Sequence, residues 1–302
     1  LVMSLKYPDA RSIAQMRQGS LLLAMAHFPT KPDRVVSLQS LGIRAISLDA
    51  IKDDGGKRLV QDIEGSANNA FMVASKYLKE IDAPLLKKPE LQALILGSGQ
   101  MGQAAVNAAI HWGGAEAVLP PVEAVCVGRS ITEGNRARLL SLLKETDILI
   151  DATARAESNL LTPVILNQEL SFLPEEALII DLSADPYSPY MVKAIEGIPH
   201  GRNRFLFDPL GLSYAQSIPE HIPQAVRRLV FSYEAWPAIF PKESMEHYGR
   251  QLLSLLEALF GLGKTMGEAY NRIFEGSRNP LVRALHRGSL KSCADNAVVA
   301  IG

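Results

Sequence analysis

The sequence is short of cysteine, of excess charge and of long apolar runs, and each shortage excludes a class of protein. Cys126 and Cys293 are the only cysteines in 302 residues, which excludes a disulfide framework and favours a reducing, cytoplasmic location. Lysines and arginines number 31 against 32 aspartates and glutamates, so a general nucleic-acid partner is not expected. No apolar run reaches the ~18 residues of a membrane span, so we expect no membrane partner.

What is present is the composition of a globular protein. Hydrophobic residues make up 47% and charged residues 21%, which excludes a largely disordered chain. The length corresponds to two domains at about 150 residues each. The first residues, LVMSLKYP, are typical of a strand already under way and do not form a signal peptide, so we expect the first domain to lack its start.

The first 81 residues alternate between strand and helix signals. The run SLLLAMA at 20–26 lies between Gly19 and Pro29, as in a buried parallel strand. Segment 43–48 predicts a further strand, and helical spacing of apolar residues predicts helices at 33–41 and 62–81. The short LLKKPE segment at 85–90 then marks a predicted domain boundary.

A second α/β unit is predicted beyond this boundary. Apolar segments with helical segments between them predict a parallel sheet, with strands at 91–96, 124–127, 148–151 and 178–181. The later pattern predicts helices at 222–233, 244–260, 265–274 and 280–287. We therefore expect an N-terminal domain at 1–85, a second domain at 86–235, and C-terminal helices at 236–302 that pack back on the first domain.

A glycine-rich turn follows the first strand of the second domain. In the GxGxxG pattern of a dinucleotide site, the first glycine allows a tight turn, the second lets the backbone approach a pyrophosphate, and the third lets helix pack on strand. The N-terminus of the following helix attracts the phosphates. Such turns also serve packing alone, but the flanking strand and helix favour a cofactor site. The residues expected to contact the cofactor here are Gly97, Ser98, Gly99, Gln100, Met101 and Gly102.

The end of the next strand bears on the choice of cofactor. NAD-binding units usually place an acidic residue there to hold the ribose 2′-hydroxyl, whereas this chain has Gly128, Arg129 and Ser130. Arginine and serine can hydrogen-bond a 2′-phosphate that a carboxylate would repel. We therefore favour NADP over NAD, the alternative being that Arg129 stacks on the adenine or faces solvent.

Three residues that could carry chemistry follow predicted strands. Lys6, His27 and Asp185 come from both halves of the chain, as a cleft between two domains requires, and ligands of open α/β sheets bind beyond the carboxyl ends of the strands. Taken singly, each residue also has an ordinary structural interpretation as a loop lysine, a structural histidine or a turn aspartate.

The chain resembles the alanine dehydrogenase family, which shares its fold with the NAD(H)-binding component of proton-translocating transhydrogenase. LVMSLKYP is similar to the family's strand ending in lysine, and LLLAMAHFPTK resembles the strand ending in the active-site histidine; the spacing of 21 residues between Lys6 and His27 agrees with the family's. IIDLSAD at 179–185 is similar to the family's VDVAxD segment, and SIPEHIP at 217–223 to the NMPxxVP loop beside the nicotinamide.

The resemblance implies an α/β fold of two Rossmann-like domains, each a doubly wound parallel sheet, with a cofactor cleft between them. It also implies reversible oxidative deamination of a small L-amino acid to a 2-oxo acid and ammonia, with hydride passing to NAD(P)⁺. Lys6 would bind the substrate carboxylate or carbonyl oxygen, His27 would exchange protons, and Asp185 would activate water or ammonia. We further expect cofactor contacts from Thr153, Ser183 and Ser217, a homo-oligomer, and no metal.

Departures from the family's pattern leave two alternatives open. Ser217 stands where the family has asparagine, the family's ribose-binding aspartate is missing, and LLKKPE replaces its GVPG-type loop. The chain could instead reduce an imine or another 2-oxo acid with the same Lys6 and His27. It could also be a non-catalytic nucleotide-binding component, although such a component should lack this pair.

Overall fold

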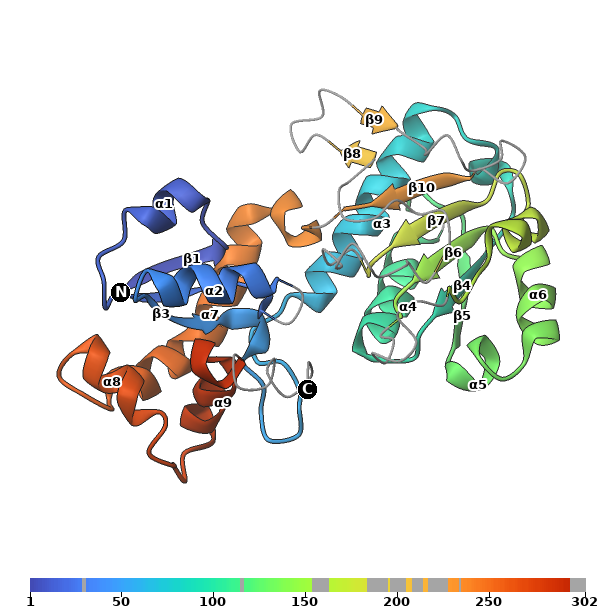
Figure 1. Ribbon diagram of the computed structural model, residues 1–302. Coiled ribbons are helices and arrows are strands. Elements are labelled where there is room, and N and C mark those ends of the chain that lie inside the picture. Colours follow the sequence, from blue (N-terminus) through green and yellow to red (C-terminus); the bar gives the residue numbers. More distant parts are fainter. Residues whose placement is uncertain are drawn as a thin grey trace. The chain divides into compact units, whose positions relative to one another are not determined.

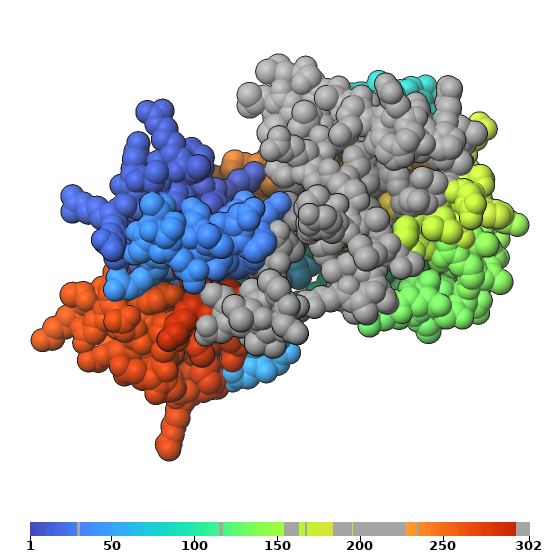
Figure 2. All heavy atoms as spheres, viewed as in Figure 1, coloured from blue at the N-terminus to red at the C-terminus, as the bar shows by residue number. Residues whose placement is uncertain are grey.

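The chain folds into two compact units, of which the second is inserted in the sequence of the first (Figure 1). The computed structural model describes residues 1–28, 31–114, 117–153, 163–183, 195, 205–207, 214–216, 228–233 and 235–293. One unit joins Leu1–Gln61 to Lys242–Gly302, and the other runs from Asp62 to Pro241. In the first unit the N-terminal segment, blue in Figure 2, lies directly against the orange and red C-terminal helices.

A three-stranded parallel sheet forms the centre of the first unit. Its order is β1 (Val2–Lys6), β2 (Leu21–Met25), β3 (Arg44–Ser47), so β2 lies in the middle. Alternate residues of β2 enter two separate cores: Leu21 and Leu23 one, Leu22 and Ala24 the other. Both faces of β2 are therefore buried, which is why its sequence is a continuous apolar run.

Helices cover the two faces of this sheet. α1 (Ala10–Ala14) and α2 (Pro32–Ser40) supply Ile13, Val35 and Leu38 to one core. The other core contains residues of α7 (Pro241–Phe260), α8 (Met266–Arg272) and α9 (Pro280–Gly288). These elements agree in kind with the strands and helices predicted from the sequence, and the buried stripe of α7 has the three- and four-residue spacing of an amphipathic helix. The short 3-10 turn η2 (Leu48–Ala50) follows β3.

The second unit is a five-stranded parallel sheet with helices on both faces. Its strand order is β10 (Leu229–Ser232), β7 (Leu178–Asp181), β6 (Ile148–Asp151), β4 (Leu91–Leu96), β5 (Val122–Val127). After β5 the chain crosses back over β4 to place β6 on its other side. The point between β4 and β6 is therefore the topological switch point, where open α/β sheets bind their ligands.

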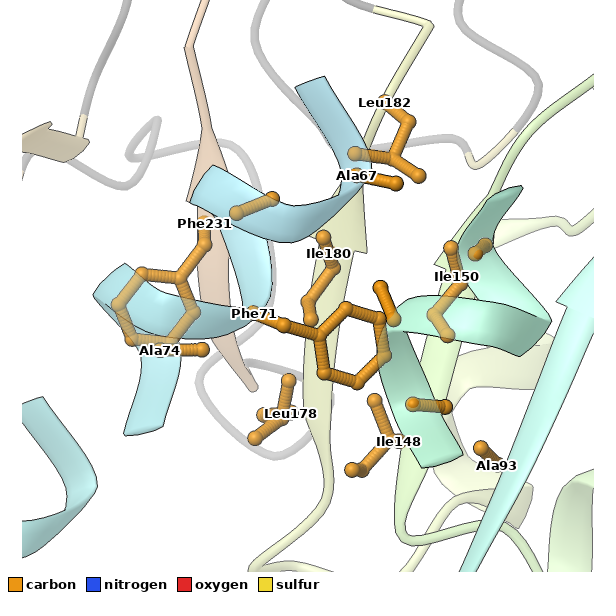
Figure 3. Close-up of a cluster of buried hydrophobic side chains, with 14 of the residues drawn as sticks. Ala67, Phe71, Ala74, Ala93, Ile148, Ile150, Leu178, Ile180, Leu182 and Phe231 are labelled. Atoms are coloured by element: carbon orange, nitrogen blue, oxygen red, sulfur yellow. The ribbon is translucent and has the colours of Figure 1, made fainter. Parts of the chain in front are cut away.

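Alternate strand residues face two helical layers. α3 (Ile63–Glu80) and α4 (Gln100–Trp112) cover one face, where Phe71 of α3 packs among Ile148, Ile150, Leu178 and Ile180 (Figure 3). α6 (Arg136–Lys144) and the 3-10 turn η5 (Asn167–Phe172) supply residues to the core on the other face. α5 (Arg129–Thr132) directly follows β5, and the remaining elements are η3 (Pro84–Lys87), η7 (Trp236–Ile239) and the antiparallel pair β8 (Phe205–Phe207) and β9 (Tyr214–Gln216).

Two sequence predictions differ from this architecture. The helix expected at 222–233 contains β10 at 229–232 instead, because Leu229 to Ser232 pair in parallel with β7 and place Val230 and Phe231 in the interior. The boundary predicted at 86 lies after α3, whereas the second unit begins at Asp62 because the apolar stripe of α3 packs on the second sheet. Leu85, in the predicted linker, is itself buried.

Along the described stretches of chain, no helix combines the length and the hydropathy needed to cross a membrane.

Candidate functional site

The glycine-rich turn lies at the switch point of the second sheet. Gly97 has a φ of 110°, and a Cβ added there would come within 2.4 Å of the Ala152 carbonyl oxygen, so the turn after β4 touches the segment after β6. A Cβ at Gly102 would lie 1.8 Å from the Gly97 carbonyl oxygen. Two of the three glycines are therefore required by the close approach of backbone to backbone.

Gly99 has no such packing reason. Outside its own helix and chain neighbours, no described atom lies within 4 Å of a Cβ added at this position. Gly99 is the N-cap residue of α4, it provides no side-chain cap, and the first turn of the helix carries no acidic residue. The first N–H groups of a helix have no partner within it, so this end offers donors and positive potential to an anion.

The other residues predicted to contact the cofactor lie in this turn or close to it in the sequence. Ser98 belongs to the turn, and Gln100 and Met101 begin α4. A Cβ at Gly128 would come 3.0 Å from the Ser98 hydroxyl, so a side chain there would press on the turn. Arg129 and Ser130 are exposed at the start of α5, with the Arg129 Nε 3.9 Å from a carboxylate oxygen of Glu133.

Two buried carboxylates, which the sequence analysis did not select, end the neighbouring strands. Asp151 ends β6, Asp181 ends β7, and both are fully buried. Asp151 accepts hydrogen bonds from the Thr153 N–H (3.0 Å) and hydroxyl (2.7 Å), while Asp181 accepts from the Ser183 N–H (3.0 Å) and the Ser232 hydroxyl (2.7 Å). The predicted cofactor contacts Thr153 and Ser183 are thus held in place by buried carboxylates.

The Ser183 hydroxyl bridges the two carboxylates. Its Oγ lies 2.8 Å from Oδ2 of Asp151 and 3.0 Å from Oδ1 of Asp181. Burial, and then the neighbouring charge of Asp181, raise the pKa of Asp151. The sequence analysis did not select these aspartates because each is the last residue of an otherwise apolar strand. A polar residue at that position indicates only where the strand ends.

In the first unit, His27 and Lys6 follow adjacent parallel strands. Lys6, the exposed last residue of β1, is paired in register with Met25 of β2, two residues before His27. Because parallel strands end at the same edge of a sheet, both residues lie at the carboxyl edge of this one. His27 has a φ of 49°, a left-handed conformation that is uncommon outside glycine.

Asp49, a residue missed from the sequence, holds His27 in this conformation. The His27 backbone N–H donates to Oδ1 of Asp49 (3.1 Å), and the ring Nδ1 lies 3.5 Å from Oδ2. The Ser47 hydroxyl donates to the same Asp49 carboxylate (2.6 Å) and accepts from the Ala26 N–H (2.9 Å). The side chains of His27 and Asp49 are 22% and 10% exposed, so the pair is largely but not completely buried.

A second cation lies at the same edge. Arg34 of α2 donates to the Ala26 carbonyl oxygen (2.9 Å), and its guanidinium lies 4.3 Å from the centre of the Tyr7 ring. Burial lowers the pKa of Arg34, and the nearby Tyr7 and Asp49 oppose that shift.

Predicted residues Asp185 and Ser217 lie outside the described part of the chain. The other predicted residues form two groups, each at the carboxyl ends of its own parallel strands.

Comparison with solved structures shows which known fold this is. The chain is similar to an L-alanine dehydrogenase, with a TM-score of 0.63 and 14% identity over 96% of this chain and 76% of that one. It is also similar to a transhydrogenase from Sinorhizobium meliloti, with a TM-score of 0.57 and 16% identity over 93% of this chain and 77% of that one.

These likenesses establish a shared two-unit α/β fold, as the sequence resemblance implied. No protein-family model matches the chain. No curated protein sequence matches it either.

Proposed function

We propose that this protein is an oxidoreductase that binds NADP or NAD at the Gly97–Gly102 turn. The observation that carries the proposal is that no described neighbour crowds a Cβ at Gly99, the N-cap of a 13-residue helix at the switch point of a doubly wound sheet. A glycine kept only for packing would be crowded, as Gly97 and Gly102 are. An uncrowded glycine at a helix N-terminus fits a site where a pyrophosphate approaches the backbone.

The preference for NADP rests on the end of β5. Gly128 leaves no carboxylate at that position, and Arg129 and Ser130 are exposed just beyond it. An arginine and a hydroxyl can hydrogen-bond a 2′-phosphate. Glu133 shares the arginine, so part of its charge is already neutralised.

The substrate chemistry belongs to the carboxyl edge of the first unit. We assign to this protein the reversible oxidative deamination of a small L-amino acid to a 2-oxo acid and ammonia. A bound nicotinamide would supply the acceptor for the hydride that leaves the substrate Cα. Lys6 supplies a cation for the substrate carboxylate or carbonyl oxygen, and His27 transfers protons at the developing carbonyl. Asp49 faces Nδ1 of His27 and so orients the imidazole ring. Asp185 completes the proposed set as the group that activates water or ammonia.

Two measurements test this function in sequence. Titration of the purified protein with NADPH and NADH, followed by nicotinamide fluorescence, should give saturable binding with the lower Kd for NADPH. A screen of L-amino acids with NADP⁺ and NAD⁺ should then produce reduced cofactor. Turnover of 2-oxo acids without ammonia would instead identify a 2-oxo acid reductase. Binding without any turnover would identify a nucleotide-binding component.

A further inference from the structure

We propose that Asp151 holds a proton at neutral pH and donates it to Ser183, so that hydrogen bonds linking Asp151, Ser183 and Asp181 position the segments after β6 and β7. The protonation itself is independent of the proposed function. Its consequence for cofactor binding rests on that function, because the segment after β6 touches the Gly97 turn.

The number of protons needed by the hydrogen bonds among Asp151, Ser183 and Asp181 supports this assignment. A serine hydroxyl has one proton to donate, and an ionised carboxylate can only accept. The Ser183 Oγ is nevertheless within hydrogen-bond distance of both Asp151 and Asp181. Two ionised carboxylates would leave one of these contacts, between the half-buried Ser183 hydroxyl and a fully buried carboxylate, without a proton. One additional proton satisfies both contacts.

The partners of the four carboxylate oxygens indicate which residue carries that proton. Both oxygens of Asp181 accept from other donors, Oδ1 from the Ser183 N–H and Oδ2 from the Ser232 hydroxyl. On Asp151, only Oδ1 does so, from Thr153, while Oδ2 has Ser183 as its partner among the described residues. The proton therefore belongs on Oδ2 of Asp151, with Asp181 ionised.

The surroundings of Asp151 favour the neutral form. On one side β4 presents Leu96 at the same register, and on the other side β7 presents Asp181, which is the charged neighbour among the described groups. Thr153 and Ser183 provide the remaining polar contacts. Burial and the like charge of Asp181 both raise the pKa of Asp151, in agreement with the proton count.

Infrared spectroscopy of the intact protein, with its aspartates labelled with ¹³C at the side-chain carboxyl, tests the location of the proton. At pH 7 the wild type should show a label-sensitive stretching band of a protonated carboxyl group. Asp151→Asn should remove that band, and Asp181→Asn should retain it. Absence of the band from the wild type, or its loss in Asp181→Asn alone, would overturn the assignment.

A matched pair of substitutions gives a second readout. Asn at 151 can donate to Ser183 and accept from Thr153, so Asp151→Asn should keep the urea midpoint of the wild type or raise it at pH 7. Asp147, just before β6, is the control: its carboxylate accepts from the Lys88 ammonium at 2.6 Å and from the Gln92 N–H. Asp147→Asn should lower the midpoint. Equal losses in both variants would contradict a neutral Asp151.

The pH dependence has a defined sign. An unfolded aspartate loses its proton near pH 4, whereas the folded protein keeps the proton on Asp151 to higher pH. Between these values the folded state binds more protons, so stability falls as pH rises. The urea midpoint of Asp151→Asn, relative to that of the wild type, should therefore increase from pH 5 to pH 8. A relative decrease would overturn the proposal.

Cofactor affinity tests the positioning role separately. Ser183→Ala removes the bridge together with a hydroxyl that is predicted to contact the cofactor, and it should raise the Kd for NADPH about tenfold, which corresponds to ~1.4 kcal/mol. Asp151→Asn, which keeps the bridge, should leave the Kd within about twofold of the wild type. An unchanged Kd in Ser183→Ala would refute positioning while leaving the infrared result valid. Failure of the wild type to bind any dinucleotide would refute the proposed function, and the infrared and urea results would still decide the location of the proton.

Discussion

Substitutions at Gly99 and Gly102 should separate cofactor binding from folding, although both glycines lie in one turn. Gly102→Ala places a methyl group 1.8 Å from the Gly97 carbonyl oxygen, so the turn must move away from α4. Forced overpacking of this kind costs about 1–3 kcal/mol. In a unit of this size, that loss lowers Tm by roughly 2–4 °C per kcal/mol.

Gly99→Val should instead weaken NADPH binding while changing thermal stability little. Among the described residues, no atom outside its own helix and chain neighbours lies within 4 Å of its Cβ, and loss of glycine at an N-cap costs about 1 kcal/mol or less. The same side chain would occupy the place where the pyrophosphate approaches the backbone. We therefore expect the Kd for NADPH to rise at least about tenfold, or ~1.4 kcal/mol, with a small change in Tm.

Differential scanning calorimetry and fluorescence titration of both variants provide the comparison. Gly99→Ala, which adds a single methyl group, is the graded control and should fall between the wild type and Gly99→Val in affinity. The reasoning would be refuted if Gly99→Val lost as much thermal stability as Gly102→Ala while its folded fraction bound NADPH as the wild type does. The turn would then serve packing alone.

Three further predictions concern the charged residues of the two units. Lys6→Ala and His27→Ala should each abolish turnover with little change in cofactor Kd. In steady-state assays the double variant should be little slower than either single variant, because the effects of groups that act on one transition state are not additive. Additive losses of activity would contradict a shared role. Asp49→Asn should lower kcat and shift the pH–rate profile, since the charge facing His27 Nδ1 is removed; an unchanged profile would exclude a positioning role. Arg129→Ala should weaken NADPH binding more than NADH binding in parallel titrations, and equal weakening would show that Arg129 does not contact a 2′-phosphate.

Continuous apolar runs made the parallel strands predictable. Leu21–Met25 and Ile148–Asp151 are buried on both faces, so their sequences carry a strong local signal. Leu229–Ser232 carries a weaker one, because its strand character comes from pairing with β7, far away in the sequence. The sequence also indicated the apolar stripe of α3. Such a stripe, however, does not specify which of the two sheets the helix packs against.

The candidate site was predictable to the extent that its residues follow strands. Lys6 and His27 follow adjacent strands, and the Gly97 turn follows the strand that lies at the switch point. Asp49 was not predictable, since its contact with His27 depends on the left-handed backbone at residue 27. Asp151 and Asp181 were missed because only the fold reveals that one serine hydroxyl bridges them.

Isotope transfer from substrate to cofactor tests the central claim most directly. The intact protein would be incubated with NADP⁺ and a panel of small L-amino acids carrying deuterium at Cα, and the reduced nucleotide would be analysed by mass spectrometry. The account predicts deuterated NADPH, together with equal amounts of 2-oxo acid and ammonia, for at least one member of the panel. Saturable NADP⁺ binding with no deuterated NADPH from any member, tested also with NAD⁺, would contradict it.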